Sequence, residues 1–258
     1  MGSNTREINI PTGCTIKDVI AYGTSGLAFL DPASTTIIKS PHSSDDYALA
    51  NIEIERKIYE RFTQQGGHKG LLQYFGPVET GIRLEYASNQ GILQYLDEHK
   101  GDISLEQRLQ WCQEVSHTLD FIHANKVVHG DLKCNNIFLD GALRAKVADF
   151  GGSSLDGSEL RVVVSASHCS PGDLDSIEGD IFALGSSMYE IMTGQAPYAG
   201  REEEEIEGLF SKSEFPDITS LGPIGGIILI CWQGKYANAH GVWTGITGLT
   251  LSLFALLL

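Results

Sequence analysis

Residues 129–136 of the chain read HGDLKCNN, and residues 149–151 read DFG. Phosphoryl transfer needs one carboxylate near the acceptor hydroxyl, and a second carboxylate with an amide oxygen to hold magnesium. Asp131 offers the first carboxylate, and Asn136 and Asp149 offer the metal-binding oxygens. Asn136 follows Asp131 by five residues, and Asp149 follows it by 18. An isolated Asp and Asn at this spacing could arise by chance, but the DFG after a strand-like run makes the pattern specific.

The two loops resemble the catalytic and metal-binding loops of the eukaryotic-type protein kinase family, over about residues 16–240. The resemblance implies a two-lobed α+β fold: a small β-rich lobe with one main helix, then a larger, mostly helical lobe. It also implies ATP and Mg²⁺ as cofactors, with Asp131 as catalytic base and Asn136 and Asp149 on the metal. Lys133 is typical of Ser/Thr-directed members and would neutralise charge on the transferring phosphate. DFGGSSLDG and the run DIFALGSSMYEIMTG are also similar to a divergent group of fungal kinases.

The chain upstream begins with short apolar runs broken by glycine, which are typical of β-hairpins. The family's glycine-rich loop aligns with AYGTSGLA, where Ala21 replaces the first glycine and Ala28 replaces the valine. Gly23 and Gly26 still allow backbone N–H groups to approach phosphates closely. By this resemblance we expect all four residues to contact the nucleotide.

Lys39 ends the apolar run IIK, where the family keeps the lysine that holds the α- and β-phosphates. An isolated lysine is usually a solvated surface charge, and the glycine hairpin before Lys39 reverses that expectation. A helix should follow, because residues 44–46 (SDD) can cap it and apolar residues then recur every four positions, at Ala50, Ile54, Ile58 and Phe62.

This helix should present a glutamate to the lysine. Glu53 and Glu55 are both candidates, but two residues differ by about 200° around a helix, so only one can face inward. Glu55 lies on a stripe with Asn51 and Tyr59, beside the predicted core face, and its surroundings resemble the family's segment E-x-x-I-Y. We therefore predict that Glu55 pairs with Lys39.

The resemblance makes two further assignments. In the hinge between the lobes, the backbone of Glu85 and Ala87 would bind adenine and Leu84 would guard the pocket behind; the alternative is an ordinary buried strand end. Asp180 would anchor the catalytic loop from beneath, although an aspartate at a helix start is usually an N-cap. The whole run DIFALG…TG…PY favours the anchoring role.

The chain departs from the family's pattern at three places. Gly130 replaces the arginine of H-R-D, the segment Ser170–Asp173 lacks the glutamate of A-P-E, and Val242–Leu258 is an uncharged apolar run. Without the arginine, we expect activity that does not depend on phosphorylation of the activation segment. The apolar run indicates a C-terminal tail, with a membrane anchor and an incorrect gene model as alternatives.

These patterns divide the chain into four parts. We expect an N-terminal tail over residues 1–15, the small lobe over 16–86, the large lobe over 87–240 and the apolar tail over 241–258.

Composition limits the partners and the compartment. Eighteen basic residues against 33 acidic ones give a net charge of −15, which argues against nucleic acid and anionic membranes and favours basic protein substrates. The acidic run Arg201–Glu205 could select basic peptides, although glutamates also favour a helix's first turn. Five scattered cysteines and an N-terminus without an apolar segment predict a cytoplasmic protein. The oligomeric state stays open.

Three functions compete. The first is an ATP- and Mg²⁺-dependent protein kinase acting on Ser or Thr. The second is a pseudokinase that binds ATP or a protein partner, which the altered glycine loop and the departures above motivate. The third is a small-molecule phosphotransferase, because HGDL…N also resembles the aminoglycoside-kinase family. That family lacks the DFG and the DIFALG run, so we rank it last.

Overall fold

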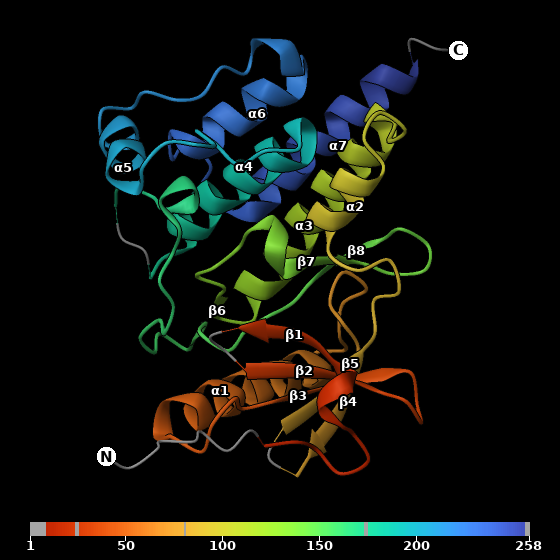
Figure 1. Cartoon of the computed structure of the whole chain (residues 1–258). Helices are drawn as coiled ribbons and strands as arrows, with labels where there is room; N and C mark the ends of the chain where they lie inside the picture. The colour runs from red at the N-terminus through yellow and green to blue at the C-terminus, as the bar shows by residue number, and fades with distance from the viewer. Residues whose placement is uncertain (1–8, 24–25, 80, 173–174, 256–258) are drawn as a thin grey trace.

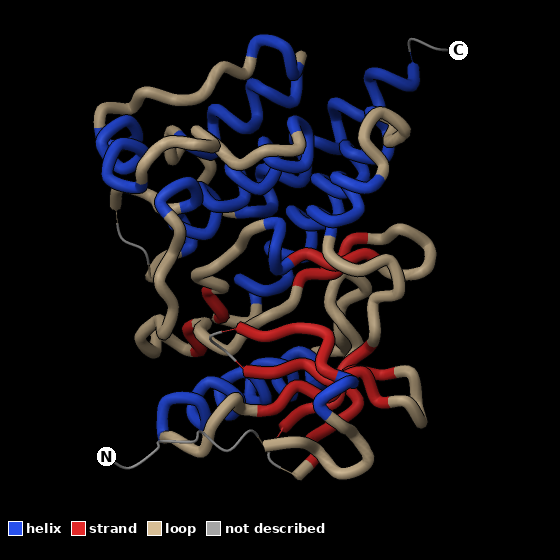
Figure 2. The backbone as a smooth tube through the Cα atoms, viewed as in Figure 1, coloured by secondary structure: helices blue, strands red, loops and turns tan. Residues whose placement is uncertain are grey.

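The computed structural model describes residues 9–255 except 24–25, 80 and 173–174, and only the backbone of 253–255. Residues 1–8, the tip of the glycine hairpin and Asp173 therefore lie outside the described residues. The described chain forms two lobes, one built on a sheet and one mostly helical (Figures 1 and 2). This arrangement confirms the expected two-lobed α+β fold.

The small lobe is a five-stranded antiparallel sheet in the order β1-β2-β3-β5-β4. Its strands are β1 (Val19–Gly23), β2 (Gly26–Asp31), β3 (Thr36–Ser40), β4 (Tyr74–Val78) and β5 (Gly81–Glu85), preceded by the 3-10 turn η1 (Ile16–Asp18). The turn between β2 and β3 begins at Asp31-Pro32, where the Asp31 carboxylate accepts a hydrogen bond from Ala33 N (2.9 Å). Lys39 lies opposite Ala28 and Ile82, so its backbone is fixed in the middle of the sheet.

Helix α1 (Asp46–Gln64) packs against this sheet (Figure 1). Asp45 caps it by accepting a hydrogen bond from Ala48 N (2.8 Å). The predicted stripe of Asn51, Glu55 and Tyr59 is buried. Ile54, expected in the core face, is only half-buried, and Ile52 is buried in its place, so the buried face is rotated towards that stripe.

The large lobe is mostly helical. Its helices are α2 (Ile92–Glu98), α3 (Leu105–Ala124), α4 (Ile177–Thr193), α5 (Glu203–Ser211), α6 (Pro223–Trp232) and α7 (Ala239–Ala255). Its short strands β6 (Val127–Val128) and β9 (Ser154–Leu155) pair with each other, as do β7 (Ile137–Leu139) and β8 (Ala145–Val147). Three 3-10 turns complete it: η2 (Cys134–Asn136), η3 (Ala166–His168) and η4 (Thr219–Leu221).

Local sequence sets the ends of two helices in this lobe. Ser104 caps α3 by accepting a hydrogen bond from Gln107 N (3.1 Å). Leu105 is 54% exposed because it lies in the first turn, before α3 enters the core. Gly194 ends α4 in the left-handed conformation (φ 81°), which glycine adopts without strain.

The expected apolar tail is, over its described part, a packed helix. Helix α7 lies along α3 (Figure 1), with Val242 and Ile246 fully buried. The Trp243 ring stacks on His117 with centroids 4.5 Å apart. Sequence pattern alone did not reveal this, because the partner face belongs to a helix more than 100 residues earlier. Within the described part of the chain, no helix combines the length and the apolarity that crossing a membrane requires.

Candidate active site

A cavity of about 1030 Å³ opens between the two lobes. All twelve residues predicted for the site line it: Ala21, Gly23, Gly26, Ala28, Lys39, Glu55, Glu85, Ala87, Asp131, Lys133, Asn136 and Asp149. They come from the hairpin β1–β2, from β3, from α1, from the link after β5 and from the loops beside β6–β8. The fold thus gathers into one place residues that lie up to 128 positions apart, from Ala21 to Asp149.

An ion-pair cluster of Lys39, Glu55 and Asp149 lines this cavity. The Lys39 Nζ atom lies 2.6 Å from Glu55 Oε2 and 2.8 Å from Asp149 Oδ1. The Glu55 side chain is fully buried, so its carboxylate needs a partner to compensate for lost hydration. Burial alone would lower the pKa of Lys39, but the carboxylates of Asp149 and Glu55 raise it above its usual value. The lysine is therefore held as a cation, the form that binds phosphate.

The DFG segment is fixed beneath α1. Asp149 has a positive φ of 67°, a conformation that costs free energy in a residue with a side chain. Phe150 is fully buried, and its ring meets those of Tyr59 and Phe62 edge-on at 5.4 and 5.3 Å. The Phe150 N–H also donates to Glu55 Oε1 (3.3 Å). These contacts hold Asp149 at the cavity wall, next to Lys39.

The loop from 129 to 136 places three polar side chains together. Lys133 Nζ donates to Asp131 Oδ1 (2.8 Å), and Asn136 Nδ2 donates to Asp131 Oδ2 (3.0 Å) and to its backbone oxygen (2.7 Å). Each carboxylate oxygen of Asp131 therefore has a positioned donor. The Asp131 side chain is 17% exposed, so it remains accessible from the cavity.

Asp180 supports this loop from the core. Its carboxylate accepts hydrogen bonds from His129 N (2.7 Å) and Gly130 N (2.8 Å), and lies 2.9 Å from His123 Nε2. Burial would raise the pKa of Asp180, but the bonds from His123 and Gly130 N hold it below its usual value. Ser176, not Asp180, is the N-cap of α4. Asp180 therefore has the anchoring position that the sequence predicted.

Residues 36–221 match the family model of the protein kinase domain, about seven tenths of the chain. The chain belongs to the protein kinase family. The match confirms the resemblance drawn from the sequence, although it begins after the glycine hairpin.

Three relatives illustrate the range of kinases to which the chain is similar. Calmodulin-binding receptor-like cytoplasmic kinase 1 of Arabidopsis thaliana is 28% identical over 68% of this chain and 41% of that protein. The probable serine/threonine-protein kinase gdt2 of Dictyostelium discoideum is 26% identical over 84% of this chain and 14% of that protein. The human receptor tyrosine-protein kinase erbB-4 is 26% identical over 55% of this chain and 12% of that protein. The chain spans about two fifths of the length of the plant relatives it matches.

The segment predicted as the hinge between the lobes lines the same cavity. Leu84 is buried at the end of β5, and Glu85, Tyr86 and Ala87 continue along the wall. The Glu85 side chain accepts a hydrogen bond from Gln73 N (3.0 Å) and lies 3.4 Å from Lys146 Nζ. Because this side chain is turned to other residues, any role of Glu85 with adenine would have to use its backbone.

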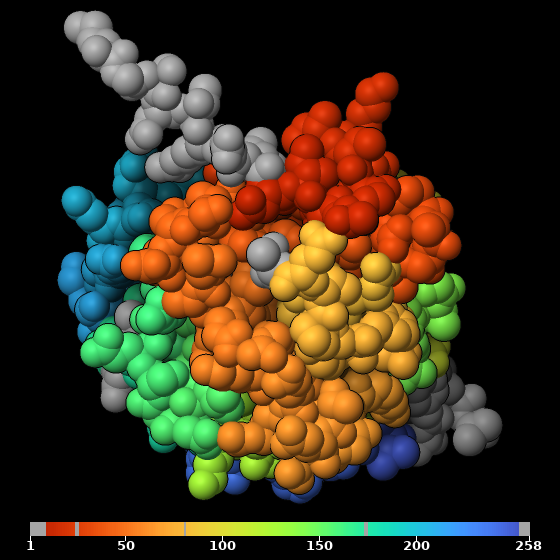
Figure 3. All heavy atoms as spheres, turned by 90° about the horizontal axis from the view of Figure 1, so that it is seen from below, coloured from red at the N-terminus to blue at the C-terminus, as the bar shows by residue number. Residues whose placement is uncertain are grey.

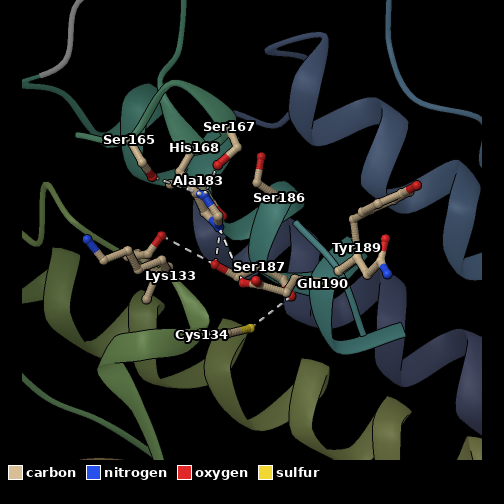
Figure 4. A network of polar contacts seen from close by, with 12 residues as sticks. Lys133, Cys134, Ser165, Ser167, His168, Ala183, Ser186, Ser187, Tyr189 and Glu190 are labelled. Atoms are coloured by element: carbon tan, nitrogen blue, oxygen red, sulfur yellow. Dashed lines mark hydrogen bonds and ion pairs between the residues drawn. The ribbon is translucent and has the colours of Figure 1, made fainter. Parts of the chain in front are cut away.

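A second polar network lies below the kinase's catalytic loop and was not predicted (Figure 4). His168 of η3 points towards Glu190 of α4, with Nε2 and Oε2 3.8 Å apart, and its Nδ1 lies 3.0 Å from Ser167 Oγ. Burial, and then Lys133, lower the pKa of His168 to about 3. Both residues line the cavity. No sequence signal indicated this pair, because Glu190 lies within a mostly apolar run and His168 lies in a loop more than 20 residues earlier.

Proposed function

We propose that the chain transfers the γ-phosphate of ATP to Ser or Thr hydroxyls of proteins. One observation carries this proposal: the ion-pair cluster of Lys39, Glu55 and Asp149 faces the same cavity as the hydrogen-bonded Asp131. The ion-pair cluster can hold phosphates and a metal, and Asp131 can receive a proton from the acceptor hydroxyl.

The residues present fit ATP and magnesium. Asn136 gives its amide nitrogen to Asp131, so its amide oxygen is left for a cation, and Asp149 offers a carboxylate. Among the described residues, no group of three or more His, Cys, Asp or Glu side chains could hold a metal. That suits magnesium, which in nucleotide sites takes one or two protein carboxylates and completes its shell with phosphate oxygens and water. When bound, the ion would neutralise charge on the phosphates.

The chain's own residues then have distinct roles in this proposal. Lys39, held by Glu55, binds the phosphates. Asp131 accepts the proton of the acceptor hydroxyl. Asn136 orients the Asp131 carboxylate through the 3.0 Å hydrogen bond. Lys133 holds the other oxygen of Asp131 and lies where it could neutralise charge on the transferring phosphate. Ala21, Gly23, Gly26 and Ala28 cover the phosphates, and the backbone of Glu85 and Ala87 binds adenine.

The kind of residue that is phosphorylated and the cellular compartment belong to the same proposal. Lys133, two residues after Asp131, supports Ser or Thr over Tyr, although the relatives include kinases of both kinds. The net charge of −15 and the exposed Glu203–Glu205 in the first turn of α5 support basic protein substrates over nucleic acid. We propose a cytoplasmic setting, in keeping with free thiols at all five cysteines.

A pseudokinase is the second candidate. Ala21 in the glycine loop, Gly130 and the segment Ser170–Asp173 without a glutamate favour it. Against it, every residue type that the chemistry needs is present, and the cavity collects them all.

Labelled ATP and an array of matched Ser, Thr and Tyr peptides test the proposal. We expect the wild type to label Ser and Thr peptides, with basic ones preferred, and Asp131→Asn to lose activity by about 10²–10⁴-fold while still binding ATP. Asp149→Ala should lose it as well, with weaker magnesium-dependent ATP binding. Wild-type protein that binds ATP without transfer would support the pseudokinase, and equal labelling by all three proteins would indicate a contaminating kinase.

A further inference from the structure

At the glycine of the H-G-D sequence a side chain would be strained by the backbone and would have to displace Leu160. Gly130 has a φ of 75°, and a Cβ atom there would lie 2.4 Å from Leu160 Cδ2 and 2.8 Å from Leu160 Cδ1. Leu160 belongs to the segment that follows DFG, so this segment fills the space that an arginine at position 130 would need.

The same segment makes a second contact of this kind. A Cβ atom at Gly152 would lie 1.9 Å from Val162 Cγ1, and Arg161 N donates to Gly152 O (2.8 Å). Residues 160–162 therefore fold back onto the start of their own segment, with two apolar side chains seated over two glycines. The Ser153 hydroxyl adds a hydrogen bond to His129 O (2.8 Å), which ties the segment to the catalytic loop.

Helix α1 reaches this segment with one stripe of side chains. Tyr47, Asn51, Glu55 and Tyr59 recur every four residues, so they share one side of the helix. Tyr59 and Glu55 contact Phe150, as described above. At the other end of the stripe, the Tyr47 hydroxyl donates to Arg161 O (2.7 Å). Figure 3 shows the orange residues of α1 beside the green residues of this segment on one face of the molecule.

We propose that Tyr47 is a positioning residue for phosphoryl transfer. Its hydroxyl fixes residues 160–162 to α1, and this fixes the rotation of α1 that places Glu55 on Lys39. The inference rests on the proposed function. The link runs from a neutral hydroxyl to a backbone carbonyl and holds the segment without a phosphate, which is the part that the missing arginine would otherwise play with a charged group.

The test removes the hydroxyl alone. Tyr47→Phe keeps the ring, and the matched control is Tyr198→Phe, between α4 and α5, whose hydroxyl donates to Glu214 O (2.8 Å) and not to residues 152–162. Amide hydrogen exchange over residues 152–162, measured on the full chain without ATP, should speed up about fivefold in Tyr47→Phe and not in Tyr198→Phe, the size expected for one neutral hydrogen bond.

Kinetics give the second reading. We expect kcat of Tyr47→Phe to fall by a similar factor with KM for the peptide unchanged, because the link positions Glu55 and does not touch the acceptor. If the wild type shows no transfer activity but exchange is still faster in Tyr47→Phe, the proposed function is rejected and the structural link between Tyr47 and Arg161 O is kept. Unchanged exchange over 152–162 in Tyr47→Phe, or an equal change in Tyr198→Phe, would overturn the link whatever the activity.

Discussion

Helices α1 and α4 hold the two halves of the active site by different physical means. Twelve of the 17 residues of α4 are buried, against seven of the 19 residues of α1. From inside the core, α4 offers Asp180 to two backbone N–H groups of the catalytic loop. From beside the cavity, α1 offers Glu55 to Lys39 and Tyr47 to a backbone carbonyl.

The difference separates stability from activity. A buried carboxylate that satisfies backbone groups cannot be removed without leaving those groups unpaired, so α4 should affect folding and activity together. Glu55 of α1 is buried as well, but an isosteric Gln there keeps an acceptor for Phe150 N and leaves Lys39 its contact with Asp149, so that change should affect activity more than folding. Four predictions test this contrast, from the largest expected effect to the smallest.

Asp180→Ala should have the largest effect. It leaves the N–H groups of His129 and Gly130 without their acceptor and His123 without its carboxylate. We expect unfolding in urea to show a loss of about 3–5 kcal/mol, with activity lost in parallel. Glu178→Ala, an exposed position on the first turn of the same helix, should cost less than about 1 kcal/mol. Equal losses in both variants would contradict the anchoring role.

Glu55→Gln should separate activity from stability. Gln cannot neutralise Lys39, which keeps its contact with Asp149 (2.8 Å), so we expect kcat/KM for ATP to fall about 10²-fold. Stability should fall by about 1–2 kcal/mol, less than in Asp180→Ala, because the amide can still accept from Phe150 N but then turns its NH2 group towards Lys39. Glu53→Gln, on the exposed side of α1 beside Arg56, is the control and should leave both quantities unchanged. A large stability loss at Glu55 would remove the contrast between the two helices.

Most of the residues discussed at this cavity could be named from the sequence, and the others could not, for a physical reason. Asp131, Asn136 and Asp149 could be predicted because phosphoryl transfer needs their chemistry and their spacing resembles that of the family, and Lys39 and Glu55 followed from that resemblance. The choice of Glu55 over Glu53 rested on helical geometry, which lets only one of them face inward, and on the resemblance of its surroundings to the family's segment E-x-x-I-Y.

What the sequence missed depends on contacts between distant segments. Nothing in the local pattern of residues 241–258 indicates that α3 has a complementary face, so the packed helix was predicted as a tail. Likewise Leu160 looks like an ordinary loop residue until its contact with Gly130 is seen. The glycine was interpreted as a lost arginine, whereas its role in packing became visible only with the fold.

Lowering the pH should destabilise the buried pair of His168 and Glu190 of α4 before it affects the contacts of α1. Burial lowers the pKa of His168 from 6.5 to about 3, so between these values the unfolded chain binds more protons than the folded one. The contribution of neutral His168 to the free energy of unfolding is therefore complete above pH 6.5. It is lost as the pH falls, by at most about 1.4 kcal/mol per pH unit. His68, with a pKa lowered to about 4, acts in the same direction, and Glu190 opposes both because burial raises its pKa.

Urea unfolding at pH 7 and pH 5 measures this dependence. His168→Asn should flatten it by about 1–2 kcal/mol over the interval, since the variant has no group to titrate. His240→Asn, at a 56% exposed side chain beside Asp120, is the control for replacing a histidine outside the core. An unchanged dependence in His168→Asn would show that His168 is protonated in the folded protein.

Removal of phosphate from the activation segment should have the smallest effect. The arginine that would bind such a phosphate is replaced by Gly130, and Leu160 fills the space beside it. Of the nearby lysines, Lys133 is paired with Asp131, and Lys146 lies 3.4 Å from Glu85. A phosphate on this segment would therefore add little to the ordering of the segment that the packed Leu160 side chain already provides. We expect phosphatase-treated and untreated protein to turn over at rates within about twofold of each other. A tenfold drop after treatment, about 1.4 kcal/mol in the barrier, would mean that charge, and not the contact of α1 with residues 160–162, holds the segment in place.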